Sequence, residues 1–325
     1  MTPQRFSRTR SGQPRSWTVA TPRTSRPTAR FLAGPVSPRQ NSIHVSPARA
    51  QRLATERRAF HVARARISEW EGPHPHLARY RAEGGAPLSR FRARSSFETL
   101  VRRAAEGQLT YVGDFHTNPE SQRTLLRLLR ALSPRVEAVG FGTEFVAGRY
   151  QEELDRYLAG RIADRTFLER TRYRDLWPYD VWTGMRPVLQ YCREAGMPVL
   201  ALDGLADEGG LEDALDLQAR DAYAAARIAA YVAQHRGAHM VIHFGESHVA
   251  EGHLPRAVDI DLARRGLSCR RLLVNQNAER IYWRLLAAGR ERVRVVEVDR
   301  RHFCVLNTRP HQQQETYLDW LERDS

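Results

Sequence analysis

Apolar and polar residues succeed one another along the chain in blocks that predict strands followed by helices. The first clear block is Leu109 to Val112, a short apolar run with β-branched and aromatic residues that ends at Gly113. A helical pattern follows, with leucines recurring on one face. Thr117 and Glu120 have the spacing of a capping box, and Pro119 suits a first helical turn. The segment therefore predicts a strand, a loop and a helix, which together form the first half of a βαβ unit.

The same order recurs towards the carboxyl terminus and predicts an α/β fold with a mostly parallel sheet flanked by helices. Residues 147–185 break this rhythm with short amphipathic segments and the aromatic sequence WPYDVW, so we expect a small helical subdomain inserted after the second strand. Trp177, Tyr179 and Trp182 form either its core or a lid over a site. Further strands are predicted at 136–145, 198–202, 239–244, 271–274, 293–298 and 302–306, and helices at 52–70, 185–195 and 212–234.

Charge is concentrated at the amino terminus. Residues 1–55 contain ten Arg and seven Pro but no Asp or Glu, and carry +10 of the formal charge of +14. Such a segment cannot bury enough apolar surface to offset the entropy of ordering, so we predict a disordered tail at 1–55. Residues 56–325 then form one α/β domain that includes the insertion at about 147–185. This domain is nearly neutral and contains no known nucleic-acid recognition motif, which disfavours specific nucleic-acid binding.

Several classes of protein are disfavoured by missing signals. No apolar run approaches the roughly 20 residues of a transmembrane helix, and the amino terminus resembles neither a signal peptide nor a lipidation site, so the default expectation is a cytoplasmic protein. The three cysteines stand far apart without a CxxC pair, which argues against a disulfide framework or a thiolate zinc site. Walker A, GxGxxG and GxSxG patterns are also absent.

Polar residues follow the predicted strands at their carboxyl ends. Asp114 and His116 follow the first strand, Glu144 ends the second, and His248 follows the strand at 239–244. Gly245 to His248 repeats the Gly-x-x-His pattern of Gly113 to His116. Because open parallel sheets bind ligands outside the carboxyl ends of their strands, we expect these side chains to converge in one crevice. Arg220, on the helix at 212–234, is the natural counter-charge for the carboxylates.

These residue types suit two kinds of chemistry. A neutral imidazole can accept a proton from water near pH 7 or ligate a divalent metal, and a carboxylate can orient it. The candidate catalytic residues are therefore His116, Glu144, Arg220 and His248, with Arg220 holding an oxyanion. The candidate metal ligands are Asp114, His116, Glu144 and His248.

The ordered set of motifs resembles the ChaN-like haem-binding family of the TIKI/TraB and erythromycin-esterase-like superfamily. The resemblance rests on GDFH followed by NPE, the strand end TEF, an insertion with Trp, the strand PVLALD, a helix with the pattern RDxxxAxRI, and the second GxxH, and it covers roughly residues 95–322. It implies a pocket lined by the two GxxH elements, Glu144 and Arg220. Asp114 stands where the family usually has Glu, the lipoprotein signal common in the family is missing, and no haem-ligating tyrosine can be matched by motif.

Two functions follow from the pattern and the resemblance. The first is binding of haem or iron, with His116 and His248 as the cofactor-binding residues and a homodimer as one possible arrangement. The alternative is a hydrolase that uses the same pocket, either with a divalent metal ion or through His and Glu alone. The expected partner is accordingly haem or another small molecule, and the sequence leaves open whether the protein is an enzyme.

Overall fold

The computed structural model describes residues 46–84, 88–177, 179–204 and 216–323. The predicted tail lies mostly outside these residues, but its expected end at residue 55 is too late. Helix α1 (Pro47–Glu71) begins inside the tail because Pro47 occupies its first turn, where a missing N–H costs nothing. Glu56, Phe60, Ala63 and Ile67 recur at helical spacing and are the buried residues of α1.

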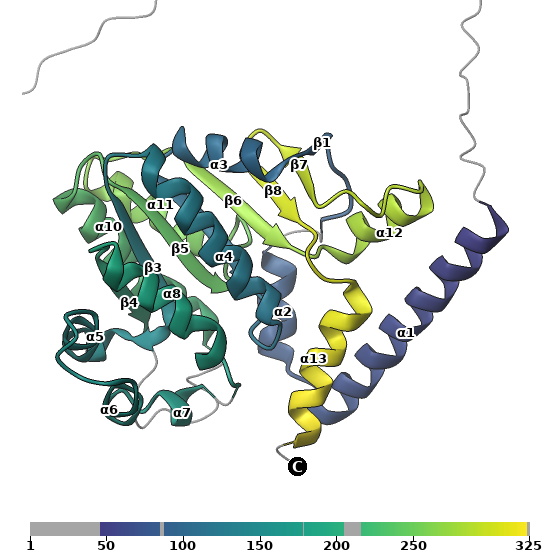
Figure 1. The fold of residues 1–325 in the computed structure, drawn as a ribbon, viewed down its shortest axis with the longest axis horizontal. Coiled ribbons are helices and arrows are strands. Elements are labelled where there is room, and N and C mark those ends of the chain that lie inside the picture. Colours follow the sequence, from purple (N-terminus) through teal and green to yellow (C-terminus); the bar gives the residue numbers. More distant parts are fainter. Residues whose placement is uncertain (1–45, 85–87, 178, 205–215, 324–325) are drawn as a thin grey trace, which may run out of the picture. The chain divides into compact units, whose positions relative to one another are not determined.

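The described residues form one sheet of eight strands in the order β1-β7-β8-β6-β2-β5-β3-β4 (Figure 1). Strands β8, β6, β2, β5, β3 and β4 are mutually parallel, whereas β7 runs antiparallel to both β8 and β1. The predicted, mostly parallel sheet is thus confirmed. The strands are β1 (Ala93–Ser95), β2 (Leu109–Asp114), β3 (Val139–Ala147), β4 (Val199–Asp203), β5 (His239–Gly245), β6 (Arg271–Gln276), β7 (Val295–Asp299) and β8 (His302–Val305).

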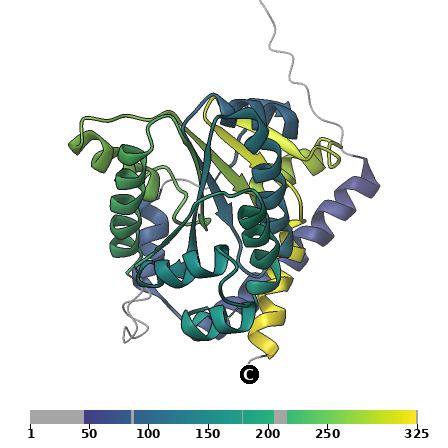
Figure 2. The ribbon, with the colours of Figure 1, turned by 60° about the vertical axis from the view of Figure 1, so that its left-hand side comes forward.

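Helices cover both faces of this sheet. Helices α3 (Phe97–Ala105), α4 (Pro119–Leu132) and α8 (Trp182–Glu194) pack on one face, and α10 (Leu217–Gln234) and α11 (Leu254–Arg264) pack on the other. Figure 2 shows the sheet between the green α10 and the blue α4. Each layer is held by a cluster of buried apolar side chains, so the sheet is buried on both faces as parallel sheets are.

Further helices surround these two layers. Helices α12 (Glu279–Ala287) and α1 pack beside β7 and β8, and α13 (Pro310–Arg323) lies against α1. Helix α2 (Pro75–Glu83) contacts α10 and begins inside a segment whose Gly, Pro and His content indicates a loop. The inserted helices are α5 (Gln151–Leu158), α6 (Asp164–Arg170) and α7 (Tyr173–Leu176), which follow β3 where the helical insertion is predicted.

The amino end of α4 differs in detail from the prediction. Asn118, not Thr117, is the residue that caps the helix, and its side chain accepts a hydrogen bond from the Glu120 N–H. Pro119 occupies the first turn as predicted, which fixes the cap one residue before it. Thr117 instead pairs its hydroxyl with that of Thr316 on α13. The helix therefore starts at the expected place but with a different cap.

Within the described residues, none of the helices combines the length and apolarity that crossing a membrane requires.

Candidate functional site

The carboxyl ends of β2 and β5 lie at the point where the chain reverses its direction of winding. These two strands are parallel neighbours, with Asp114 in register with Gly245. The helix after β2, α4, packs on one face of the sheet, and the helix after β5, α11, packs on the other. Such a switch point is where open α/β sheets bind ligands. Both GxxH motifs therefore begin at the strand ends of this switch point.

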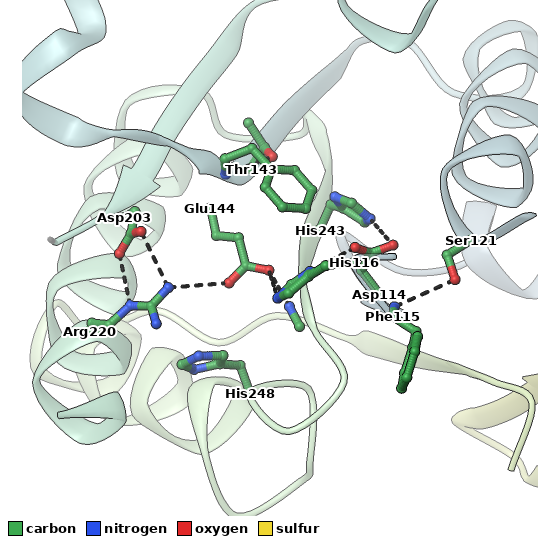
Figure 3. A network of polar contacts seen from close by, with 12 residues as sticks. Asp114, Phe115, His116, Ser121, Thr143, Glu144, Asp203, Arg220, His243 and His248 are labelled. Atoms are coloured by element: carbon green, nitrogen blue, oxygen red, sulfur yellow. Dashed lines mark hydrogen bonds and ion pairs between the residues drawn. The ribbon is translucent and has the colours of Figure 1, made fainter. Parts of the chain in front are cut away.

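Asp114 and His116 form a buried hydrogen-bonded pair at the end of β2. The His116 Nδ1 lies 2.9 Å from Asp114 Oδ2 (Figure 3). Gln122 donates to Asp114 Oδ1 at 2.8 Å. The His243 Nε2 lies 3.4 Å from the same Oδ1. Burial alone would raise the pKa of Asp114, but the neighbouring His243 and His116 lower it to about 2. Burial would lower the pKa of His116, but Glu144 and Asp114 raise it above its ordinary value.

These two shifts predict a window of pH in which the pair stabilises the fold. The contribution of Asp114 is present above its unfolded pKa near 3.8 and is lost as the pH falls towards 2. The contribution of His116 is present below its unfolded pKa near 6.5 and is lost as the pH rises through its higher folded pKa. We expect Asp114→Asn to lower the free energy of unfolding by about 2 kcal/mol at pH 5 and by much less at pH 2. Urea unfolding at both pH values measures this, and an equal loss at pH 2 would contradict the assignment.

Glu144 and Arg220 form the centre of the site. The Glu144 side chain is fully buried within β3, which continues to Ala147, so Glu144 does not stand at a strand end as predicted. Its Oε1 accepts a hydrogen bond from the Gly245 N–H and lies 3.8 Å from His116 Nε2. Its Oε2 lies 3.5 Å from Arg220 Nη2. The Arg220 guanidinium also binds both oxygens of Asp203, the last residue of β4, at 2.9 and 3.2 Å. Arg220 thus pairs with two buried carboxylates. Burying these carboxylates without an opposite charge would be costly in free energy.

Gly245 brings its backbone against two site residues. A Cβ atom at this position would lie 3.2 Å from the His116 ring and 3.5 Å from Glu144 Oε1. We therefore expect Gly245→Ala to displace the imidazole by a few tenths of an ångström and to weaken ligand binding about tenfold, because a site tolerates little misplacement. Ligand titration together with thermal unfolding checks this. Gly237→Ala, which has open space around its Cβ but a positive φ, is the control for strain without a site effect. Unchanged affinity in Gly245→Ala would contradict the prediction.

His248, the histidine of the second GxxH motif, contacts a carboxylate through Nδ1 in the same way as His116 does. His248 Nδ1 lies 2.7 Å from Asp221 Oδ1, and the Tyr80 hydroxyl donates to Asp221 Oδ2 at 2.6 Å. The Tyr80 hydroxyl oxygen is also 3.1 Å from His248 Nδ1. Burial, and then the charge of Asp221, raises the pKa of Tyr80, so this hydroxyl stays protonated as a donor. Asp221 follows Arg220 in α10, and this adjacency connects His248 to the network around Glu144.

Each of the two GxxH motifs therefore contributes a histidine that is paired with a carboxylate. In each, a carboxylate binds the Nδ1 atom of an imidazole and so leaves Nε2 as the atom able to bind a ligand or a proton. Figure 3 shows His116 and His248 in one view with Glu144 and Arg220. Of the five residues that the sequence indicates, contacts join Asp114, His116, Glu144 and Arg220 in one chain, whereas His248 contacts Asp221 and Tyr80. The sequence does not indicate Tyr80, because a tyrosine distant in the chain leaves no motif.

Aromatic rings surround the imidazole of His116. The centroids of Phe145 and Trp177 each lie 5.3 Å from the His116 ring, and that of Tyr179 lies 5.5 Å away. Trp182 instead packs on Tyr157 within the inserted helices. The insertion thus serves both expected purposes, since Trp182 belongs to its core while Trp177 and Tyr179 cover the site. The His116 side chain remains 23% exposed, which leaves a route for a ligand.

The site has some of the features that metal and haem sites require. Within the described ranges, no group of three or more His, Cys, Asp or Glu side chains is arranged to hold a metal ion. A single imidazole ligand is a different case. His116 has the outer carboxylate partner that ligating histidines have, and aromatic walls suit a flat porphyrin. The residues around His116 therefore fit a haem better than a bare divalent ion.

Comparisons with known proteins agree with this arrangement. Residues 100–208, about a third of the chain, match the family model described as "Haem-binding uptake, Tiki superfamily, ChaN". No curated protein has a significant match. Among solved structures, ChaN of Campylobacter jejuni, described as binding heme cofacially, is 13% identical with a TM-score of 0.42, covering 56% of this chain and 86% of that one.

Two further solved structures are similar to the same degree. The type III effector HopBA1 is 14% identical with a TM-score of 0.44, covering 68% of this chain and 98% of that one. RRSP, a MARTX toxin effector domain from Vibrio vulnificus CMCP6, is 19% identical with a TM-score of 0.31, covering 63% and 41%. These structural likenesses are too weak to carry an argument about function, whereas the family model spans Asp114, His116, Glu144 and the aromatic insertion. Residues 100–208 are thus similar to the ChaN-like haem-binding family of the Tiki superfamily.

Proposed function

We propose that this protein binds haem at the crevice between β2 and β5, with His116 as the residue that holds it. The observation that carries the proposal is the imidazole of His116, which is fixed through Nδ1 by Asp114 and surrounded by Phe145, Trp177 and Tyr179. Among the described residues, its Nε2 faces Glu144 at 3.8 Å and makes no hydrogen bond. The family model that residues 100–208 match is described by haem binding, which supports the same ligand. Bound haem would supply a redox-active iron.

The remaining site residues have defined parts in this proposal. His248, held through Nδ1 by Asp221, offers a second imidazole on the same crevice. Arg220 pairs with both Glu144 and Asp203 and so holds their side chains in place. The proposal includes a homodimer as one arrangement, in which two protomers share the ligand. The stoichiometry of binding distinguishes this arrangement from a monomer.

Titration with haemin tests the proposal. We expect a shifted Soret band that saturates at one haem per chain, or at a fixed lower or higher ratio if protomers share ligands. Asp114→Asn removes the outer partner of His116 and should weaken binding about 10- to 100-fold. Asp175→Asn changes an exposed carboxylate in α7 and is the matched control. Absence of saturable binding by the folded protein, or equal losses in both variants, would overturn the proposal.

A second candidate function, hydrolysis, is favoured by the duplication of the Asp–His pair around Glu144. Either imidazole can accept a proton from water through Nε2 while its carboxylate stabilises the resulting imidazolium. The hydroxide would then attack a carbonyl or similar centre, and the proton would pass to the leaving group. Glu144, 3.8 Å from His116 Nε2, would orient the water.

Hydrolysis of a p-nitrophenyl acetate probe tests this candidate. If it holds, Glu144→Gln should reduce the rate at least about 100-fold, the lower range for loss of a positioned acid or base. Glu120→Gln, at an exposed position in α4, is the control. A parallel assay with a chelator separates metal-dependent from metal-free chemistry. A rate equal to that of the buffer, or a Glu144→Gln variant as active as the natural chain, would exclude hydrolysis of this probe class at the site.

A further inference from the structure

A cavity lies between α3, α4 and the strands β1, β7 and β8, apart from the network around Glu144. Its volume is about 680 Å³, within the range of small-molecule sites. The buried residues that line it are mainly apolar and include Val295, Val305 and Leu306. Its exposed lining is dominated by five arginines, Arg94, Arg123, Arg127, Arg292 and Arg294. We call this cavity the arginine groove.

The arginine groove concentrates positive charge with little compensation. Its one carboxylate is that of Glu120, which pairs with Arg123. Within the described residues, the other four arginines of the groove form no ion pair with an Asp or Glu side chain. Arginines elsewhere on the surface often pair with an acid one helical turn away, as Arg165 does with Glu169. The convergence of unpaired charge is therefore a feature of this groove, and a bound anion would relieve its self-repulsion.

Two local features of the groove favour the binding of an anion. The Arg127 guanidinium lies 3.8 Å from the centroid of the Phe97 ring, which holds its plane in one orientation. The amino end of α3 also lines the groove through Ser95, Ser96 and Phe97, and the Ser96 hydroxyl caps the helix by accepting from the Thr99 N–H. A helix amino end adds a positive potential and N–H donors. Arginine forks beside such an end match the oxygens of phosphate groups.

We propose that the arginine groove binds a small organic polyphosphate of the nucleoside diphosphate class. The phosphate oxygens bind the arginine forks near the start of α3, and the apolar body of the ligand packs on Phe97 and the buried valines. A single inorganic anion would leave the apolar lining unused, and a membrane surface would not enter a groove of this volume. This binding is separate from haem binding in position and in the residues used.

Isothermal titration calorimetry of the full chain with ADP, adenosine and pyrophosphate tests the proposal. ADP should bind more tightly than either fragment, because only ADP uses both the arginines and the apolar lining. Arg94→Gln and Arg292→Gln should each weaken ADP binding about tenfold, as expected for loss of one charge-assisted pair. Arg165→Gln removes the same charge from α6 and should leave the affinity unchanged. Because the ten arginines of residues 1–55 also attract anions, the difference between these variants carries the test.

Three results would overturn the proposal. The first is the absence of saturable ADP binding. The second is pyrophosphate binding as tight as that of ADP, or equal losses in Arg165→Gln and the groove variants. The third is binding of a single-stranded oligonucleotide under conditions where ADP does not bind, which would make the groove a nucleic-acid surface instead.

Discussion

Replacing Arg220 with methionine is expected to lower the free energy of unfolding by about 3 to 5 kcal/mol, the cost of leaving buried charge without its partner. The guanidinium is 11% exposed, and the side chains of Glu144 and Asp203 that it binds are 1% and 0% exposed. Methionine fills a similar volume but removes the guanidinium charge from beside both carboxylates. Buried charge that loses an opposite charge is costly. Urea unfolding at pH 7 measures the loss.

Two further variants isolate the charge effect. Arg227→Met changes the same residue type on the same helix, where Arg227 donates to Gln151, and should cost only about 1 kcal/mol. Adding Asp203→Asn to Arg220→Met removes one uncompensated carboxylate and should recover part of the stability. A cost of about 1 kcal/mol or less for Arg220→Met would contradict the role of Arg220 as the counter-charge of the site.

The second large effect is expected from the two histidines. His116→Ala and His248→Ala should each remove an imidazole from the crevice, and each should weaken haemin binding by more than the change at Asp114 does. If the two imidazoles act as a unit, the double variant should lose little more than either single variant. Haemin titration of the three variants measures the coupling. The fold should survive, because Asp114 keeps its hydrogen bond from Gln122 and Asp221 keeps that from Tyr80.

An exposed histidine provides the control for this series. His61 lies on the exposed face of α1, where its ring contacts only the neighbouring Phe60 among the described aromatic contacts. His61→Ala should therefore bind haemin as the natural chain does. If the fold-loss in haemin affinity of the double variant equals the product of the two single losses, His116 and His248 act independently.

The fold could be predicted from the sequence because its strands are short apolar blocks that end at glycine. Gly113 and Gly245 mark the ends of β2 and β5, from which both GxxH motifs start. Glu144 was expected in the second strand, but β3 continues past it to Ala147. Periodicity and strand-end position are local signals, and they suffice for residues carried by the sheet.

Contacts across long stretches of chain could not be predicted. Tyr80 contacts Asp221 although 141 residues separate them, and no motif around Tyr80 marks it as a site residue. The bond between Arg220 and Asp203 depends on how α10 packs against β4, which no local pattern encodes. The cap of α4 was predicted at the wrong residue because Thr117 and Asn118 both have capping side chains, and packing against α13 decides between them.

The most direct test of the shared site is nitrogen NMR of the histidine side chains during titration with gallium protoporphyrin, a diamagnetic analogue of haem. At alkaline pH, we expect both His116 and His248 to carry their proton on Nδ1, as the bonds to Asp114 and Asp221 require. The Nε2 signals of both residues should then shift together and reach their end points at the same ratio of porphyrin to protein. A porphyrin that shifts the signals of only one of these histidines, or of neither, would contradict a single ligand site at the ends of β2 and β5.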